Sequence, residues 1–174
     1  HRERYAIAHA VLREVLARTQ TLASEHAVAS VVVGFAAREG SLLFPDFLAY
    51  LESELRVEDQ IFRLTRERAL LILRDVEVRQ AESVVERLRA NFEREFPSSR
   101  GVDVSIRYLA VPPGPVSISV KSVLPAVFGG AAEHDLIKFV AAFVDAEDAD
   151  VANVVVTAGV NTTGHFQFYL TEII

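Results

Sequence analysis

An almost wholly apolar segment near the N-terminus places the strongest constraint on how this chain can fold. Residues 27–37 read AVASVVVGFAA, a run that is rich in β-branched side chains and carries no charge. Successive side chains of a strand point to opposite faces of its sheet, so a strand of this composition has no face suited to water. The segment therefore predicts a strand that is buried on both faces.

Helical and strand patterns alternate on either side of this segment. Apolar residues recur at helical spacing in the predicted helices, whereas residues 102–108 alternate as in a strand with one covered face. The predicted elements are a helix over 3–26, the strand over 27–37, a helix that begins near Pro45, strands over 60–64 and 69–73, a helix over 77–96 and a strand over 102–108. This order predicts an α/β fold in which helices flank a central mixed sheet.

One breaker cluster, Pro112-Pro113-Gly114-Pro115, interrupts the pattern, and we predict a domain boundary there. It separates a first domain over 3–111 from a small α+β appendage over 115–174. In the appendage the patterns predict a strand over 116–123, a helix over 133–145 and a hairpin of two strands over 151–158 and 165–171.

The balance of residues excludes several classes of function. With 18 basic and 24 acidic residues the net charge is −6, and every arginine lies at or before Arg107, so the clustered basic stripe of a nucleic-acid-binding protein is missing. The absence of cysteine excludes disulfides and thiol catalysis, and the five histidines lack metal-ligand spacing. No apolar run approaches the roughly 18 residues of a membrane span. We therefore expect no metal site, no cofactor and a cytoplasmic location. Because methionine is also absent, we expect the chain to be the cytosolic part of a larger protein.

A set of short motifs follows the second predicted helix in a fixed order. Arg56-Val57-Glu58-Asp59 is followed by five residues and then by Thr65-Arg66-Glu67-Arg68-Ala69. The apolar strand 70–73 comes next, and Glu86-Arg87-Leu88-Arg89 lies on the following helix. In order and spacing the set resembles the GGDEF (diguanylate cyclase) family, which reads R-x-x-D, five residues, GGDEF, a strand and a helix with an E-R-hydrophobic-R run. The resemblance covers about residues 3–111 and implies a GGDEF-like fold.

The departures from the family pattern bear on activity. Thr65 and Arg66 replace the paired glycines that let the backbone approach GTP phosphates, and Arg68 reverses the charge of a signature acid. The end of the first strand, Gly34-Phe35-Ala36, offers no carboxylate where the family has a metal ligand. Two-metal phosphoryl chemistry needs such carboxylates to hold magnesium. We therefore expect no catalytic residue and no enzymatic activity.

The R-x-x-D motif of the family's inhibitory site is present in this sequence as Arg56-Val57-Glu58-Asp59. The resemblance implies that Arg56 and Asp59 bind cyclic di-GMP, with Arg87 as a second arginine. An arginine fork can meet guanine O6 and N7, and a carboxylate can accept from guanine N1–H and N2–H₂. The chain is thus expected to be a non-catalytic cyclic di-GMP receptor in bacterial signalling.

Two other interpretations stay open. Arg56 and Asp59 can form a surface ion pair that only fixes the turn between helix and strand. The chain would then be a ligand-independent protein-interaction or dimerisation module, in which the appendage docks on a second copy or on a partner protein. We expect Glu67, with Arg66 and Arg68, to lie at an exposed charged hairpin tip.

Overall fold

The computed structural model describes residues 2–97, 101–128, 154–160 and 166–172. Its elements are α1 (Arg2–His26), β1 (Ser30–Ala37), α2 (Phe44–Glu54), β2 (Gln60–Arg63), β3 (Arg68–Arg74), α3 (Val78–Glu95), β4 (Val104–Val111), α4 (Val120–Phe128), β5 (Val154–Val160) and β6 (Phe166–Glu172). The order α-β-α-β-β-α-β predicted before the breaker cluster is confirmed. None of the helices in the described ranges is both long and apolar enough to cross a membrane.

The strands of the described ranges form one mixed sheet in the order β4-β1-β3-β2-β6-β5. β1 is antiparallel to β3 and β4, and β2 is antiparallel to β3. β6 runs parallel to β2, and β5 returns antiparallel to β6. Val31 and Val33 lie in one hydrophobic core and Val32 lies in the other, and all three are 0% exposed, which confirms the strand predicted to be buried on both faces.

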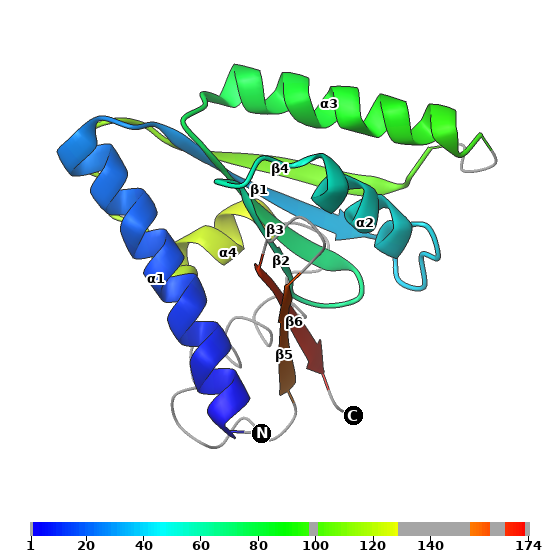
Figure 1. Ribbon diagram of the computed structural model, residues 1–174, viewed down its shortest axis with the longest axis horizontal. Helices are drawn as coiled ribbons and strands as arrows, with labels where there is room; N and C mark the ends of the chain where they lie inside the picture. Colours follow the sequence, from blue (N-terminus) through cyan, green and yellow to red (C-terminus); the bar gives the residue numbers. More distant parts are fainter. Residues whose placement is uncertain (1, 98–100, 129–153, 161–165, 173–174) are drawn as a thin grey trace.

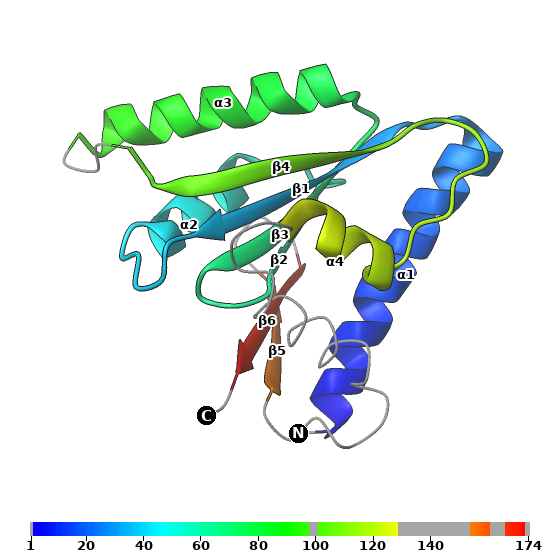
Figure 2. The same ribbon diagram turned by 180° about the vertical axis from the view of Figure 1, so that it is seen from behind.

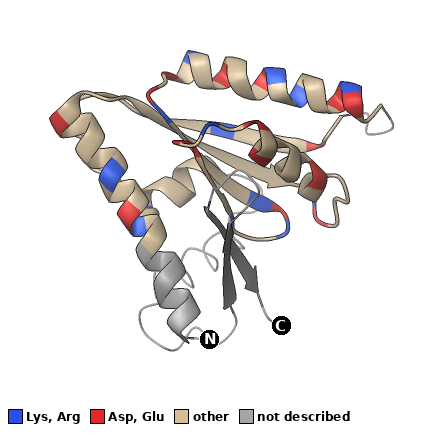
Figure 3. Ribbon diagram, in the orientation of Figure 1, with Lys and Arg blue, Asp and Glu red and all other residues tan. Residues whose placement is uncertain are grey.

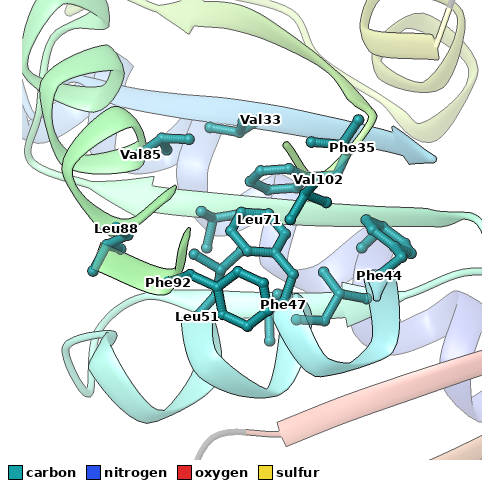
Figure 4. Close-up of a cluster of buried hydrophobic side chains, with 14 of the residues drawn as sticks. Val33, Phe35, Phe44, Phe47, Leu51, Leu71, Val85, Leu88, Phe92 and Val102 are labelled. Carbon is teal, nitrogen blue, oxygen red and sulfur yellow. The ribbon is translucent and has the colours of Figure 1, made fainter. Parts of the chain in front are cut away.

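Helices cover both faces of the half of the sheet that contains β1 (Figure 1). α2 and α3 lie on one face and α1 and α4 on the other, as the view from behind also shows (Figure 2). On the first face aromatic side chains of α2 and α3 pack against β1, and the rings of Phe47 and Phe92 lie 5.4 Å apart (Figure 4). The second face is filled by Leu12 and Leu16 of α1 and by Val127 of α4. The predicted α/β class, with helices flanking a central mixed sheet, is confirmed.

The strand predicted over 116–123 is wrong, because α4 begins at Val120. Val116, Ile118 and Val120 alternate with serines, which imitates a strand with one covered face. Ser119 instead stands where a helix cap belongs: its hydroxyl accepts from the backbone N–H of Ser122 at 3.3 Å, and its carbonyl accepts from Val123 N–H at 2.9 Å. Such a cap satisfies N–H groups that a helix start leaves without partners.

The hairpin predicted near the C-terminus is confirmed as β5 and β6, with Thr157 opposite Tyr169. β6 joins the sheet beside β2, where Tyr169 stands opposite Arg63. The helix predicted over 133–145 lies outside the described residues. The division into a domain over 3–111 and an appendage over 115–174 stays a prediction.

Candidate ligand-binding site

Arg56 and Asp59 lie in the turn that joins α2 to β2. α2 ends at Glu54, and Leu55 already has an extended conformation. The turn is closed by a backbone hydrogen bond from Asp59 N–H to the Arg56 carbonyl at 3.1 Å. The Asp59 carboxylate also accepts from the Arg56 backbone N–H at 3.3 Å, a local bond of the kind that makes Asp common in turns. The two motif ends are thus held together by the backbone itself.

The side chains of the two residues form a bidentate pair. Arg56 Nε donates to Asp59 Oδ2 at 2.9 Å, and Arg56 Nη2 donates to Asp59 Oδ1 at 2.8 Å. Two parallel charge-assisted bonds fix both the distance and the plane of a guanidinium. The pair is asymmetric in exposure: 45% of the Arg56 side chain is exposed, against 3% for Asp59. Asp59 therefore belongs to the interior, and Arg56 presents its outer surface to solvent.

The pair is also fastened to the end of β3. Arg56 Nη2 donates to the carbonyl of Arg74 at 2.7 Å, and the Arg74 backbone N–H donates to Asp59 Oδ1 at 3.3 Å. Each Asp59 oxygen thus accepts two hydrogen bonds. Asp75, next along the chain, has a φ of +58°, a left-handed conformation that Asp tolerates better than most residues. The Arg56–Asp59 pair consequently sets how β3 leaves the sheet toward α3.

Acidic groups surround the Arg56 guanidinium. The hydrogen bond from Asp59 raises the pKa of Arg56, burial lowers it, and the charges of Asp59, Glu58 and Asp75 raise it further. Glu58 Oε1 lies 3.5 Å from Arg56 Nη1, the guanidinium nitrogen that takes no part in the bidentate pair. The site therefore presents a permanently charged donor next to a half-exposed carboxylate, at 42% exposure for Glu58.

Arg87 lies on the solvent-facing side of α3. Ala81, Val85, Leu88 and Phe92 form the buried stripe of this helix, and Arg87 is exposed, as the spacing predicts. Acidic and basic residues recur along the ribbon of α3 (Figure 3). Between these described residues, no hydrogen bond or ion pair joins Arg87 to Arg56 or Asp59. The structure therefore brings Arg56 and Asp59 together but does not bring Arg87 into contact with them.

Residues Leu64 to Arg68 form the tip of the β2–β3 hairpin. The N–H groups of Leu64 and Thr65 both donate to the Arg68 carbonyl, and Glu67 N–H donates to Thr65 Oγ1 at 3.2 Å. The Glu67 carbonyl accepts from Ala37 N–H at 2.7 Å, which ties the tip to the end of β1. Arg66 is exposed and Glu67 and Arg68 are partly exposed, so the predicted charged hairpin tip is confirmed. Within the described ranges no three acidic or histidine side chains gather as metal ligands.

Two features of this region escape the sequence patterns. Motif reasoning treats Glu58 as a variable position and assigns no role to Arg74, which follows the strand predicted over 69–73, yet both contact the Arg56 guanidinium. A second ion pair, Arg63 Nε to Glu52 Oε1 at 2.8 Å, joins β2 to α2 with side-chain exposures of 18% and 8%. The spacing of charges along the helix offers only a weak signal for it, because a partner on another element is set by tertiary packing.

Comparison with known proteins identifies solved structures that share this fold. No protein-family model matches the sequence, and no curated protein matches it at a significant level. Three solved structures of PelD from Pseudomonas aeruginosa do match. The PA14 protein in complex with c-di-GMP gives a TM-score of 0.59 at 20% identity over 74% of this chain, and its apo form gives 0.58 at 19% identity over 74%. The PAO1 protein gives 0.57 at 20% identity over 72%.

The chain spans about half the length of the PelD chains, which are covered to 48%, 48% and 46%. At this level of identity the likeness shows the fold alone. It confirms the GGDEF-like α/β class that the sequence predicts.

Proposed function

We infer that this chain is a non-catalytic receptor for cyclic di-GMP, which binds at an R-x-x-D-type site formed by Arg56, Asp59 and Arg87. One observation carries the proposal: a buried Asp59 holds the half-exposed Arg56 guanidinium in a fixed plane at the motif position of a GGDEF-like fold. That one of the PelD structures with this fold is a complex with c-di-GMP supports the choice of ligand.

The geometry suits recognition of a guanine base. A guanidinium whose plane is already fixed loses little conformational freedom when it meets a ligand, so more of the interaction energy appears as affinity. Arg56 can donate through Nη1 and offer its flat face to a purine, whereas Asp59 keeps it in place. Arg87 adds an exposed positive charge that suits the phosphates of a cyclic dinucleotide.

Calorimetric titration with cyclic di-GMP tests the proposal. Arg56→Ala removes a charged donor, so we expect its affinity to fall by about ten- to a hundredfold, with a smaller loss for Arg87→Ala. Arg18→Ala is the matched control, because it removes the same charge from an exposed pair on α1, on the other face of the sheet. Thermal melts of each variant separate lost binding from lost folding. Absence of heat for the wild type at about 100 μM ligand would reject the proposal.

A second function is favoured by the burial of Asp59. Both of its oxygens already accept hydrogen bonds within the chain, as expected of a purely structural pair. In that case the chain is a ligand-independent interaction module, with a second copy or a partner protein docked through residues 115–174. Wild-type protein that ignores cyclic di-GMP yet forms a dimer through this segment would support this function instead.

A further inference from the structure

Glu58 is the exposed carboxylate of the candidate site, and Asp59 is the buried one. The Asp59 side chain is 3% exposed, and each of its oxygens accepts from two N–H groups of the chain. A carboxylate so placed can accept a hydrogen bond from a ligand only if one of its bonds to Arg56 or Arg74 breaks. The acceptor that a guanine base needs must therefore come from elsewhere in the site.

Glu58 offers that acceptor beside a donor. Its Oε1 lies 3.5 Å from Arg56 Nη1, and the two side chains are 42% and 45% exposed. Arg56 Nε and Nη2 donate to Asp59 and to the Arg74 carbonyl, whereas Nη1 is the guanidinium nitrogen that lies beside Glu58. A long contact between half-exposed charges is weak, and a ligand can insert between the two groups without a large loss.

The edge of guanine matches this pair of groups. Its O6 accepts a hydrogen bond, and the adjacent N1–H and N2–H₂ donate. We propose that Arg56 Nη1 donates to guanine O6 while the Glu58 carboxylate accepts from N1–H and N2–H₂, so that Glu58 determines selectivity for guanine. Adenine reverses the pattern, with a donor at N6 and an acceptor at N1. Its N6 donor would face the Arg56 Nη1 donor, and its N1 lone pair would face the Glu58 carboxylate. Asp59 is then a positioning residue that holds Arg56.

This inference rests on the proposed function, and its test compares two ligands on two matched variants. Glu58→Ala removes the acceptor, and Glu54→Ala removes the same charge from an exposed residue two positions before Arg56. Cyclic di-GMP and cyclic di-AMP are titrated into each variant and the wild type. We expect Glu58→Ala to lose about tenfold or more in affinity for cyclic di-GMP and to lose most of the preference over cyclic di-AMP, because charge-assisted bonds to the base disappear.

The control separates base recognition from general electrostatics. Cyclic di-GMP is an anion, so loss of a nearby acid should strengthen binding slightly, as we expect for Glu54→Ala. If Glu58→Ala binds cyclic di-GMP as Glu54→Ala does, or more tightly, Glu58 competes with the ligand and the inference is overturned while the proposed function stands. If the wild type does not bind cyclic di-GMP at all, both fall. Thermal melts should show Glu58→Ala folded, since its contact is long and half-exposed.

Discussion

Gly34 of β1 lies directly beneath Val127 of α4. A Cβ atom added at Gly34 would stand 2.6 Å from Val127 Cβ and 2.9 Å from the Val127 carbonyl oxygen, closer than such atoms approach. α4 follows the Pro112–Pro115 breaker in sequence, yet it packs on β1, which lies far before the breaker. The absence of a side chain at one residue thus decides how a later segment covers the sheet.

Gly34→Ala should therefore destabilise the protein, because α4 must shift outward to admit the new methyl group. We expect a loss of about 1–3 kcal/mol in the free energy of unfolding, the usual cost of overpacking. Urea denaturation measures it, with Ala110→Val at an exposed position of β4 as a control that adds carbon atoms at the surface. Unchanged stability in Gly34→Ala would mean that α4 does not sit on β1 in solution.

The Arg56–Asp59 pair should contribute to stability as a unit. Arg56→Ala leaves a buried carboxylate with only two backbone donors, and we expect a loss of about 1–3 kcal/mol in the free energy of unfolding. Asp59→Ala should cost a similar amount, and the double variant should cost less than the sum, by about 1 kcal/mol or more. Strictly additive losses in urea denaturation would contradict a coupled pair.

Tyr108 on β4 gives a pH dependence with a definite sign. Burial, and then the charges of Glu86 and Glu82, raise the pKa of Tyr108 from 10.0 to about 12. The folded state holds this phenol proton more tightly than the unfolded state. The stability of the folded protein that depends on protonated Tyr108 is therefore complete below pH 10 and is lost as the pH rises toward about 12. Alkaline titration of phenolate absorbance should lose its latest-titrating group in Tyr108→Phe. An unchanged late step would show that another tyrosine causes it.

No cyclase activity is expected from the hairpin tip. Thr65, Arg66 and Arg68 replace two glycines and one acid of the signature, which removes room for phosphates and a carboxylate for metal. Incubation with GTP and magnesium or manganese should give no cyclic dinucleotide above a control without protein. Product formation that Glu67→Ala abolishes would contradict this prediction.

The sequence predicts the sheet better than it predicts the segment after the breaker. β1 is recognisable because its apolar residues leave neither face suited to contact with solvent. In α3 the spacing of the apolar residues predicts which side of the helix is exposed. α4 is missed because alternation over Val116–Val120 and the helix cap at Ser119 compete within the same few residues. The local sequence pattern fits both a strand and a helix here. The helix is selected by tertiary packing, because Val127 of α4 packs on Gly34.

In the candidate site, too, the sequence predicts which residues lie close together but not the burial or the contacts of each side chain. Spacing is enough to place Arg56 near Asp59, because residues three apart meet in a turn. Spacing does not reveal that Asp59 is buried, since its burial depends on the end of β3 and on the backbone of Arg74. The exposure of Glu58 beside Arg56 Nη1 follows from the same arrangement and is equally invisible in the motif.

Hydrogen exchange with and without saturating cyclic di-GMP tests the central claim most directly, because it reports both binding and its location. The account predicts slower exchange in the turn over 55–60, at the end of β3 and the start of α3 over 74–78, and around Arg87. Arg56→Ala should lose this protection, whereas Arg18→Ala should keep it. Exchange that is unchanged by the ligand, or protection confined to the hairpin tip over 65–69, would contradict the account.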